Sequence, residues 1–483
     1  MTHPLRIAFI HPDLGIGGAE RLVVDAALGL TQLGHTVTIY TSFHTPARSF
    51  AETHDGTLQV RVLGGWLVPR SVFQRCVTIC AVLRQLHLSL HLICLSLSLF
   101  LSHQSVCDVF FVDQLSAAIP LLRYLTRTPV LFYGHFPDLL LSSDNNPSSG
   151  LLAKLKALYR LPLDWLEEYT TANADTILVN SHFTAEVFTR TLTSINKKPK
   201  VVYPGVDITT YDIPEHDQAD LKTSLIHSDR PTILSINRFE RKKDINLILQ
   251  AFIQLRKKVT TSSSDSGLLP PRLVLAGGYD ERLADNRQTL KALQANVPAH
   301  MSQQTLTPDE VESVDATGTT SSPDVLFLLN ISHPNKLALL RARSTKLLGY
   351  TASNEHLGIG PLEGMACRLP VLAVDSGGPR ETVDDPRTGF LVPPDPVQWA
   401  HTIRNILTMD DHQRRLMGDA GRERVVQLFS THVMAKQFEN TIHEIMLASS
   451  RRSDLWLEPG FFFLISFIIV PLLTISIGAR QFL

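Results

Sequence analysis

The sequence has little cysteine, no charge bias and no hydrophobic segment at its start. The five cysteines among 483 residues are scattered and form no CxxC pair, which disfavours a disulfide framework and fits a reducing compartment. The formal net charge is −1, so no basic field is present to recruit nucleic acid. Residues 1–6 lead straight into a predicted strand, and we expect no cleavable signal peptide.

One long apolar run lies near the C-terminus. Residues 461–478 are uncharged and as a helix would be about 27 Å long, just short of a bilayer core of about 30 Å. Pro471 would kink this helix, so a span and a re-entrant segment both stay open. Arg451 and Arg452 favour a cytosolic position for the preceding chain, although Arg480 follows the run.

A stretch with two glutamates has the strongest functional pattern. Glu355 and Glu363 are separated by seven residues, and Gly358 and Gly360 predict a tight loop where a ligand approaches the backbone. A short helix and a buried strand follow, and a second helix is predicted to begin at Pro379. Two helix N-termini beside a strand end would attract an anion. A solvated pair of carboxylates beside an ordinary loop is the alternative.

A second glycine-rich stretch lies near the N-terminus. Residues 6–11 are predicted as a strand, and a loop with Gly15, Gly17 and Gly18 leads into a helix and another strand. The spacing is not GxGxxG, and no acidic residue ends the second strand, so a nicotinamide cofactor is disfavoured. These glycines would let the backbone approach a phosphate, whereas a tight turn without a ligand is the alternative.

Cations and a histidine follow two other predicted strands. Arg238 and Lys243 lie after residues 231–236, where Arg can bind a diphosphate bidentately and Lys acts as a point charge. A solvated charge run is the alternative. His135 follows residues 129–133, and in a doubly wound sheet that end faces the ligand crevice, although a lone histidine is more often structural.

Three further segments are assigned by their pattern. Residues 68–101 are predicted as a helix with an apolar surface, which is either a buried core helix or a membrane-contacting patch. Residues 337–348 are predicted to be helical and to lead into the two-glutamate stretch. Residues 208–230 are predicted to form a polar linker between two domains.

Several of these segments together resemble a known enzyme family. YGHFPDLLL, SINRFERKKDI and SNEHLGIGPLEGMA resemble the retaining glycosyltransferases of family 4. The resemblance implies an α/β protein of GT-B architecture, with two Rossmann-like doubly wound domains facing across a cleft and a C-terminal membrane segment. Gly134 stands where a cysteine is often seen, and Gly364 where alanine is usual. The expected parts are residues 1–207 for the acceptor domain, 208–230 for the linker, 231–409 for the donor domain, 410–448 for helices packing back on the first domain, and 449–483 for the anchor.

The resemblance also implies residue roles. Glu355 would face the donor sugar, Glu363 would hold the ribose hydroxyls, and His135 would contact the sugar from the other domain. Arg238 and Lys243 would hold the nucleotide phosphates, and Glu355, His135 and Lys243 form the expected catalytic set. Further donor contacts are expected from the backbone at Gly17, Gly18 and Gly358, and helix N-termini at Gly18 and Gly378 would stabilise the departing diphosphate. No bound cofactor and no metal ligand are expected.

Within that family the segments look most like the mannosyltransferases of the dolichol pathway. This implies transfer of α-1,3 and α-1,6 mannose from GDP-mannose to dolichyl-diphosphate-linked Man1GlcNAc2 in N-glycosylation. The endoplasmic reticulum membrane would be the location, with the catalytic domains in the cytosol and other enzymes of the pathway as further partners. A family 4 enzyme using a UDP-sugar, and an inactive membrane scaffold of the same fold, are the alternatives.

Overall fold

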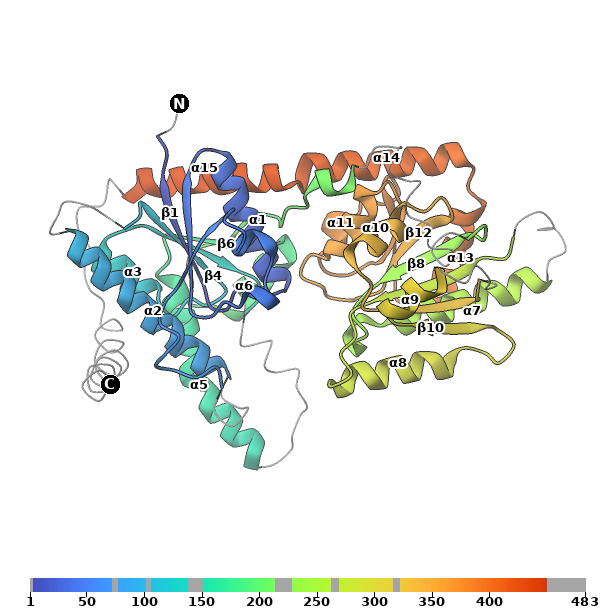
Figure 1. The fold of residues 1–483 in the computed structure, drawn as a ribbon, viewed down its shortest axis with the longest axis horizontal. Helices are drawn as coiled ribbons and strands as arrows, with labels where there is room; N and C mark the ends of the chain where they lie inside the picture. Colours follow the sequence, from blue (N-terminus) through green and yellow to red (C-terminus); the bar gives the residue numbers. More distant parts are fainter. Residues whose placement is uncertain are drawn as a thin grey trace. The chain divides into compact units, whose positions relative to one another are not determined.

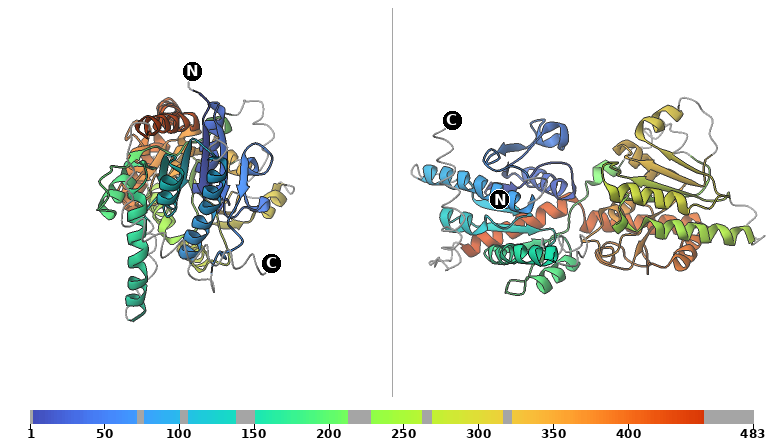
Figure 2. Two further views of the ribbon diagram at one scale, coloured as in Figure 1. Left: turned by 90° about the vertical axis from the view of Figure 1, so that its left-hand side faces the viewer. Right: turned by 90° about the horizontal axis from the view of Figure 1, so that it is seen from below.

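The computed structural model describes residues 3–71, 77–100, 106–137, 151–212, 228–261, 269–315 and 322–449. The chain forms two compact units: Met1–Gly205 with Thr431–Leu483, and Val206–Ser430. Each unit contains one parallel sheet with helices on both faces (Figure 1, Figure 2). The predicted membrane segment, residues 461–478, lies outside the described residues.

The first unit is built on seven parallel strands in the order β3-β2-β1-β4-β5-β6-β7. The strands are β1 (Arg6–His11), β2 (Thr36–Thr41), β3 (Gln59–Val62), β4 (Val109–Asp113), β5 (Val130–Gly134), β6 (Thr176–Val179) and β7 (Lys200–Val201). The helices are α1 (Gly18–Gln32), α2 (Val77–Phe100), α3 (Ile119–Thr126), α5 (Leu151–Ala172), α6 (His182–Thr191) and α15 (Thr431–Ser449).

The inner strands β1, β4, β5 and β6 of this sheet are buried on both faces. Ile7 and Phe9 of β1 belong to the core that includes residues of α1 and α15, whereas Ala8 and Ile10 belong to the core that includes residues of α2 and α3. This division follows from the period of two along a strand, which sends alternate side chains to opposite faces. The unbroken apolar run of residues 7–10 in β1 is therefore what a sheet covered on both faces requires.

Helix α2 confirms the predicted helix at residues 68–101, with bounds Val77–Phe100. Leu86, Leu88 and Leu92 are buried in the core of the first unit, which favours the core-helix alternative for this part of the helix. By length and composition alone, Val77–Ser96 could cross a membrane, and 50% of its most apolar window is buried. The helix therefore carries only weak evidence of membrane contact.

The second unit has seven parallel strands in the order β10-β11-β9-β8-β12-β13-β14. The strands are β8 (Thr232–Ile236), β9 (Arg272–Gly277), β10 (Gln303–Leu306), β11 (Val325–Leu329), β12 (Thr345–Tyr350), β13 (Val371–Val374) and β14 (Gly389–Val392). The helices are α7 (Ile245–Thr261), α8 (Ala284–Asn296), α9 (Pro308–Asp315), α10 (His333–Arg341), α11 (Ile359–Ala366), α12 (Pro379–Thr382), α13 (Pro396–Thr408) and α14 (Asp411–Leu428).

One helix prediction was wrong in its second half. Residues 337–348 do not form one helix, because α10 ends at Arg341 and the chain then forms β12. Strand β12 pairs with β8 and β13, so it lies inside the sheet. A strand covered on both faces has no alternating pattern, and periodicity does not separate it from a buried helix.

The ends of the second unit also differ from the expected boundaries. Ile208–Tyr211, assigned to the linker, forms the 3-10 helix η3, and Tyr211 is buried. Helix α14 packs on α11 within the second unit, so only α15 of the two last helices joins the first unit. Residues 213–227, most of the rest of the expected linker, lie outside the described part of the chain.

Candidate functional site

The predicted donor residues of the second unit gather where the strand order reverses. Strands β8 and β12 are neighbours there, and the chain leaves them in opposite directions across the sheet. Lys243 lies in the 3-10 helix η5 (Arg241–Lys243) after β8, and Glu355 lies in the loop after β12. Their side chains form an ion pair, with Lys243 Nζ 2.6 Å from Glu355 Oε1. The structure therefore brings two of the predicted donor residues into contact at the point where the strand order reverses.

Thr351, directly after β12, contacts the backbone of this ion pair. The hydroxyl of Thr351 donates a hydrogen bond to the backbone carbonyl of Lys243 at 2.6 Å. Burial opposes the charged form of Glu355, but the nearby ammonium of Lys243 lowers the pKa of Glu355 below its ordinary value. Glu355 is thus a carboxylate near neutral pH, and Lys243 is its counter-ion.

The glycines after Glu355 pack against an aromatic ring. A Cβ on Gly358 or Gly360 would lie 3.1 or 3.2 Å from the ring of Tyr350. Gly358 also has φ +84°, a backbone conformation that L side chains rarely adopt. Burial and the Glu355 carboxylate raise the pKa of Tyr350 well above its ordinary value, so the phenol stays neutral. The loop therefore needs glycine for its conformation and for its contact with Tyr350.

Glu363 forms a second ion pair on helix α11. Its Oε1 lies 2.7 Å from Lys336 Nζ and accepts a hydrogen bond from the Tyr211 hydroxyl at 3.0 Å. Lys336 lies in the first turn of α10, where the Ser332 side chain caps the helix by accepting from the Asn335 N–H. Sequence reasoning missed Lys336 and Tyr211, which are 27 and 152 residues from Glu363.

Two residues that were predicted to help bind phosphate, Arg238 and Gly378, have other partners in the structure. The side chain of Arg238 is 62% exposed, and its Nη1 lies 3.0 Å from Glu240 Oε1. The N–H of Gly378 donates to the carbonyl of Glu355 at 2.8 Å, and α12 has only four residues. Gly378 is therefore not a free helix N-terminus, whereas α11 begins directly after Gly358.

The predicted residue His135 follows β5 and lies beside two residues that were not predicted, at the ends of β1 and β4. His135 Nε2 is 2.9 Å from Asp113 Oδ1, and His11 Nδ1 is 2.8 Å from Asp113 Oδ2. Strands β1 and β4 are the neighbours at which this sheet reverses its order. His135 is therefore part of a hydrogen-bonded group that sequence reasoning did not assemble.

The glycine loop of the first unit leads into helix α1. Gly17 precedes the helix with extended backbone, and Gly18 is its first residue. The Glu20 carboxylate folds back over Gly17 and would clash with a Cβ there, whereas Gly18 has open space around it. The acidic side chain would have to move before an anion could bind at Gly17.

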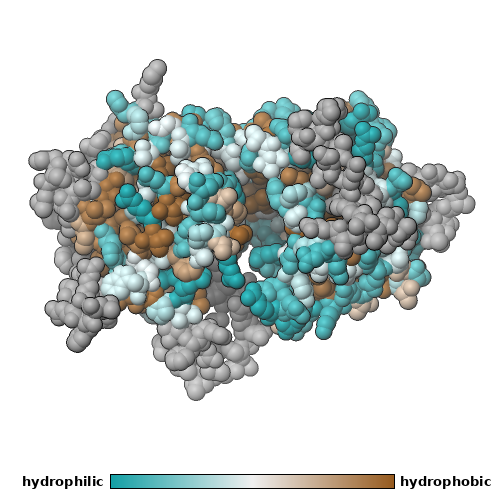
Figure 3. Space-filling model, viewed as in Figure 1, coloured by the Kyte–Doolittle hydropathy of each residue, from teal (hydrophilic) through white to brown (hydrophobic). Residues whose placement is uncertain are grey.

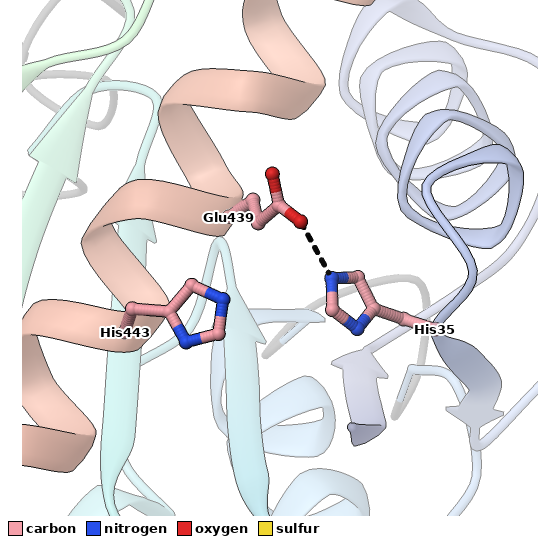
Figure 4. Close-up of side chains that lie close together, drawn as sticks. All are labelled: His35, Glu439 and His443. Carbon is pink, nitrogen blue, oxygen red and sulfur yellow. Dashed lines mark hydrogen bonds and ion pairs between the residues drawn. The ribbon is translucent and has the colours of Figure 1, made fainter. Parts of the chain in front are cut away.

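A possible metal centre in the first unit fits a hydrogen-bond network better. His35, Glu439 and His443 lie together, with ligand atoms within 4.8 Å of one another (Figure 4). The backbone N–H of Leu5 donates to His35 Nδ1 at 3.2 Å, so the ring proton is on Nε2, which donates to Glu439 Oε1 at 3.2 Å. A protonated nitrogen cannot ligate a metal. Moving the proton to Nδ1 would point that N–H at the N–H of Leu5, so that two donors would face each other. The group ties α15 to the start of β2.

Comparison with known proteins covers nearly the whole chain. Residues 16–210 match the model "Glycosyltransferase Family 4", and residues 217–424 match "Glycosyl transferases group 1". The alpha-1,3/1,6-mannosyltransferase ALG2 of Rhizomucor pusillus is 43% identical over 450 residues, 93% of this chain and 94% of the relative. This chain belongs to the alpha-1,3/1,6-mannosyltransferase family. The Homo sapiens member of this mannosyltransferase family is 39% identical, over 91% of this chain and 96% of its own length.

Solved structures agree with the GT-B fold of this mannosyltransferase family. A sucrose-phosphate synthase from Thermosynechococcus elongatus has a TM-score of 0.62 at 20% identity and covers 92% of this chain and 99% of its own. A glycosyltransferase from Rickettsia africae has a TM-score of 0.62 at 17% identity, over 92% of this chain and 99% of its own. At these identities the likeness is one of fold. The predicted two-domain GT-B architecture is confirmed.

Proposed function

We propose that this chain transfers mannose from GDP-mannose to dolichyl-diphosphate-linked Man1GlcNAc2 and makes both the α-1,3 and the α-1,6 linkage. Its family supports the reaction type, because the curated relatives are alpha-1,3/1,6-mannosyltransferases. The chain is accordingly a mannosyltransferase of N-glycan precursor synthesis. The nucleotide, the exact acceptor and the role of each residue are the parts that we propose.

The ion pair between Lys243 and Glu355 is the observation that carries the donor site. A diphosphate brings negative charge that can replace the Glu355 carboxylate as the partner of Lys243. Glu355 would then be released to hold the mannose hydroxyls. The backbone at Gly358 and the first turn of α11 would approach the donor from the same loop.

The chemical step requires groups that stabilise negative charge on the leaving group. In a retaining transfer the bond from mannose to the phosphate oxygen breaks, and negative charge grows on the departing GDP. Lys243 and Arg238 would stabilise that charge, with the backbone at Gly17 and Gly18 as a further donor contact. Among the proposed donor residues, Glu355 holds the mannose hydroxyls and Glu363 the ribose, which leaves no second carboxylate placed as a nucleophile, so we favour attack from the same face. The acceptor hydroxyl then gives its proton to the departing phosphate oxygen.

The two remaining roles are proposed for Glu363 and His135. Glu363 accepts two contacts on Oε1, which leaves Oε2 for the ribose hydroxyls of the nucleotide. His135 contacts the transferred mannose and completes the catalytic set with Glu355 and Lys243. No cofactor or metal takes part in the proposed steps.

Membrane attachment is proposed from the substrate and from the apolar segments. A dolichyl acceptor requires the enzyme to work at a membrane, and we place it at the cytosolic face of the endoplasmic reticulum. Residues 449–483 are the proposed anchor and lie outside the described residues. Exposed apolar side chains on the first unit, including Ile16, Trp66 and Val77, are further candidates for contact with lipid or with other pathway enzymes.

Donor competition tests the proposal. The purified chain is incubated with GDP-mannose and a synthetic lipid-linked Man1GlcNAc2, and products are identified by mass and linkage. We expect products with one and two added mannoses, inhibited by GDP much more strongly than by UDP. Transfer from a UDP-sugar alone would favour another family 4 activity. Nucleotide binding without transfer to any acceptor would favour an inactive scaffold.

A further inference from the structure

The carboxylate of Asp113 lies between two histidine rings. Asp113 ends β4 and its side chain is 0% exposed, with both oxygens in contact with ring nitrogens of His11 and His135 at 2.8 and 2.9 Å. Burial alone would favour the neutral acid. The two ring N–H groups, that of His135 foremost, nevertheless lower the pKa of Asp113 below its ordinary value. Asp113 is therefore an ionised carboxylate inside the first unit.

This charge determines the tautomer of each ring. An ionised carboxylate only accepts hydrogen bonds, so His135 carries its proton on Nε2 and His11 on Nδ1. The side chain of His135 is 21% exposed, which leaves its Nδ1 lone pair for a ligand. The ring of His11 is wholly buried, and its Nε2 has no hydrogen-bond partner among the described residues, with Glu20 Oε1 4.0 Å away. The ring of His135 is therefore accessible from solvent, whereas the ring of His11 hydrogen-bonds only to the carboxylate among the polar groups of the described residues.

We propose that Asp113, supported by His11, is a positioning residue that fixes the tautomer and the ring orientation of His135 during mannose transfer. The proposal rests on the function proposed above, in which His135 contacts the transferred sugar. With Nε2–H bound to Asp113, the ring accepts a hydrogen bond from a sugar hydroxyl at Nδ1 in its neutral form, which is present above the raised pKa of His135. Without the carboxylate, the ring exchanges tautomers and rotates, and only part of the enzyme presents the required acceptor.

The groups around His135 determine the direction of its pH response. Burial lowers the pKa of His135, but the Asp113 carboxylate, with a smaller contribution from Glu20, raises it overall. Tyr133 packs edge-on at 5.2 Å between ring centroids and stays neutral, because burial and Asp113 raise its pKa. His11 competes with His135 for the same carboxylate. Removing the charge of Asp113 should therefore lower the pKa of His135, whereas removing the His11 hydrogen bond should raise it.

The test compares Asp113→Asn, His11→Leu and His11→Asn in the full-length enzyme with GDP-mannose and the lipid-linked acceptor. Asp113→Asn should lower kcat about 10- to 100-fold with the donor KM little changed. In a plot of kcat against pH, the limb that reports the titration of His135 should move to lower pH. His11→Leu should cause a smaller loss and move the limb to higher pH. His11→Asn keeps a donor at the place of Nδ1 and should behave like the wild type.

Asp108→Asn is the matched control, because Asp108 precedes the same strand at its opposite end and pairs with Arg6 on the surface at 2.6 Å. Wild-type kcat and an unmoved pH limb in Asp113→Asn would overturn the proposal. An inactive wild type would instead overturn the proposed function. If thermal unfolding shows that Asp113→Asn is not properly folded, the two His11 variants provide the test instead. Equal pH limbs of kcat in both variants would contradict the positioning role.

Discussion

The two units place their polar groups at the same point of similar sheets but use different chemistry there. Both sheets have seven parallel strands, and the order reverses between β1 and β4 in one and between β8 and β12 in the other. His11 and Asp113 end the first pair of strands, whereas Lys243 and Glu355 follow the second pair. The topology accounts for the location of each group, and the residue types at the strand ends account for what each can do.

Solvent access separates the two groups further. The Asp113 side chain is 0% exposed, whereas those of Glu355 and Glu363 are 23% and 16% exposed. A carboxylate that is fully buried between two rings can orient a neighbour but cannot reach a ligand. The two Lys–Glu pairs of the second unit can exchange partners when an anion binds. On the face drawn in Figure 3, the coloured surface of the first unit has larger apolar areas than that of the second.

Among the changes to the second unit, Lys243→Ala should cause the largest loss of kcat/KM. The variant loses a charge-assisted contact to the diphosphate, which costs about 1.5–3 kcal/mol, or about one to two orders of magnitude in kcat/KM. Steady-state kinetics with GDP-mannose measure the loss. Lys242→Ala is the control, because the Lys242 side chain is 64% exposed and faces Glu240. Equal kinetics in the two variants would show that Lys243 does not contact the diphosphate.

Sequence reasoning could select the candidate residues that lie close together along the chain, but not the residues that contact them in the fold. Glu355, Glu363 and the glycines between them are local in sequence, so their spacing is readable. Lys336 and Tyr211 reach Glu363 only through the fold, and no local pattern connects them. The same limit hid the contacts of Asp113 with His11 and His135, because the three residues lie at the ends of three different strands. Helical and sheet periods identify elements, whereas partners across a sheet require its strand order.

Lys336→Ala and Tyr211→Phe test whether the support of Glu363 matters for nucleotide binding. Each change removes one contact to Oε1, and we expect Lys336→Ala to weaken GDP binding about tenfold and Tyr211→Phe about threefold. Isothermal titration with GDP measures both. Neither change should move the ratio of α-1,3 to α-1,6 product. Unchanged GDP affinity in both variants would show that Glu363 does not depend on these contacts.

Arg238→Ala should have a smaller effect than Lys243→Ala. The guanidinium is exposed and paired with Glu240, so donor binding gains less from it than from a partly buried cation. We expect a donor KM raised about threefold, with the effect fading as salt is added. A loss as large as that of Lys243→Ala would mean that Arg238 turns inward when the donor binds.

Glu439→Gln concerns stability in the first unit. Burial opposes the charge of Glu439, but hydrogen bonds from Lys436 and His35 lower its pKa overall. A lowered folded-state pKa stabilises the fold above the unfolded value of about 4.3, and this contribution is lost as pH falls below it. At pH 7 the variant should therefore lose about 1 kcal/mol in urea unfolding. The difference from the wild type should shrink below pH 4.3, and a constant difference would contradict the ion-pair account.

The most direct test asks whether one site in the second unit makes both linkages. The chain has one Glu355–Glu363 stretch and one Arg238/Lys243 cluster, so two bonds must arise from two poses of the acceptor. Glu355→Gln keeps the size of the side chain and removes its charge. The variant is given acceptors with one and with two mannoses in separate reactions, and each product is quantified. The account predicts that both additions fall together, within a factor of a few. Loss of one addition with the other near normal would contradict it and require a second donor site.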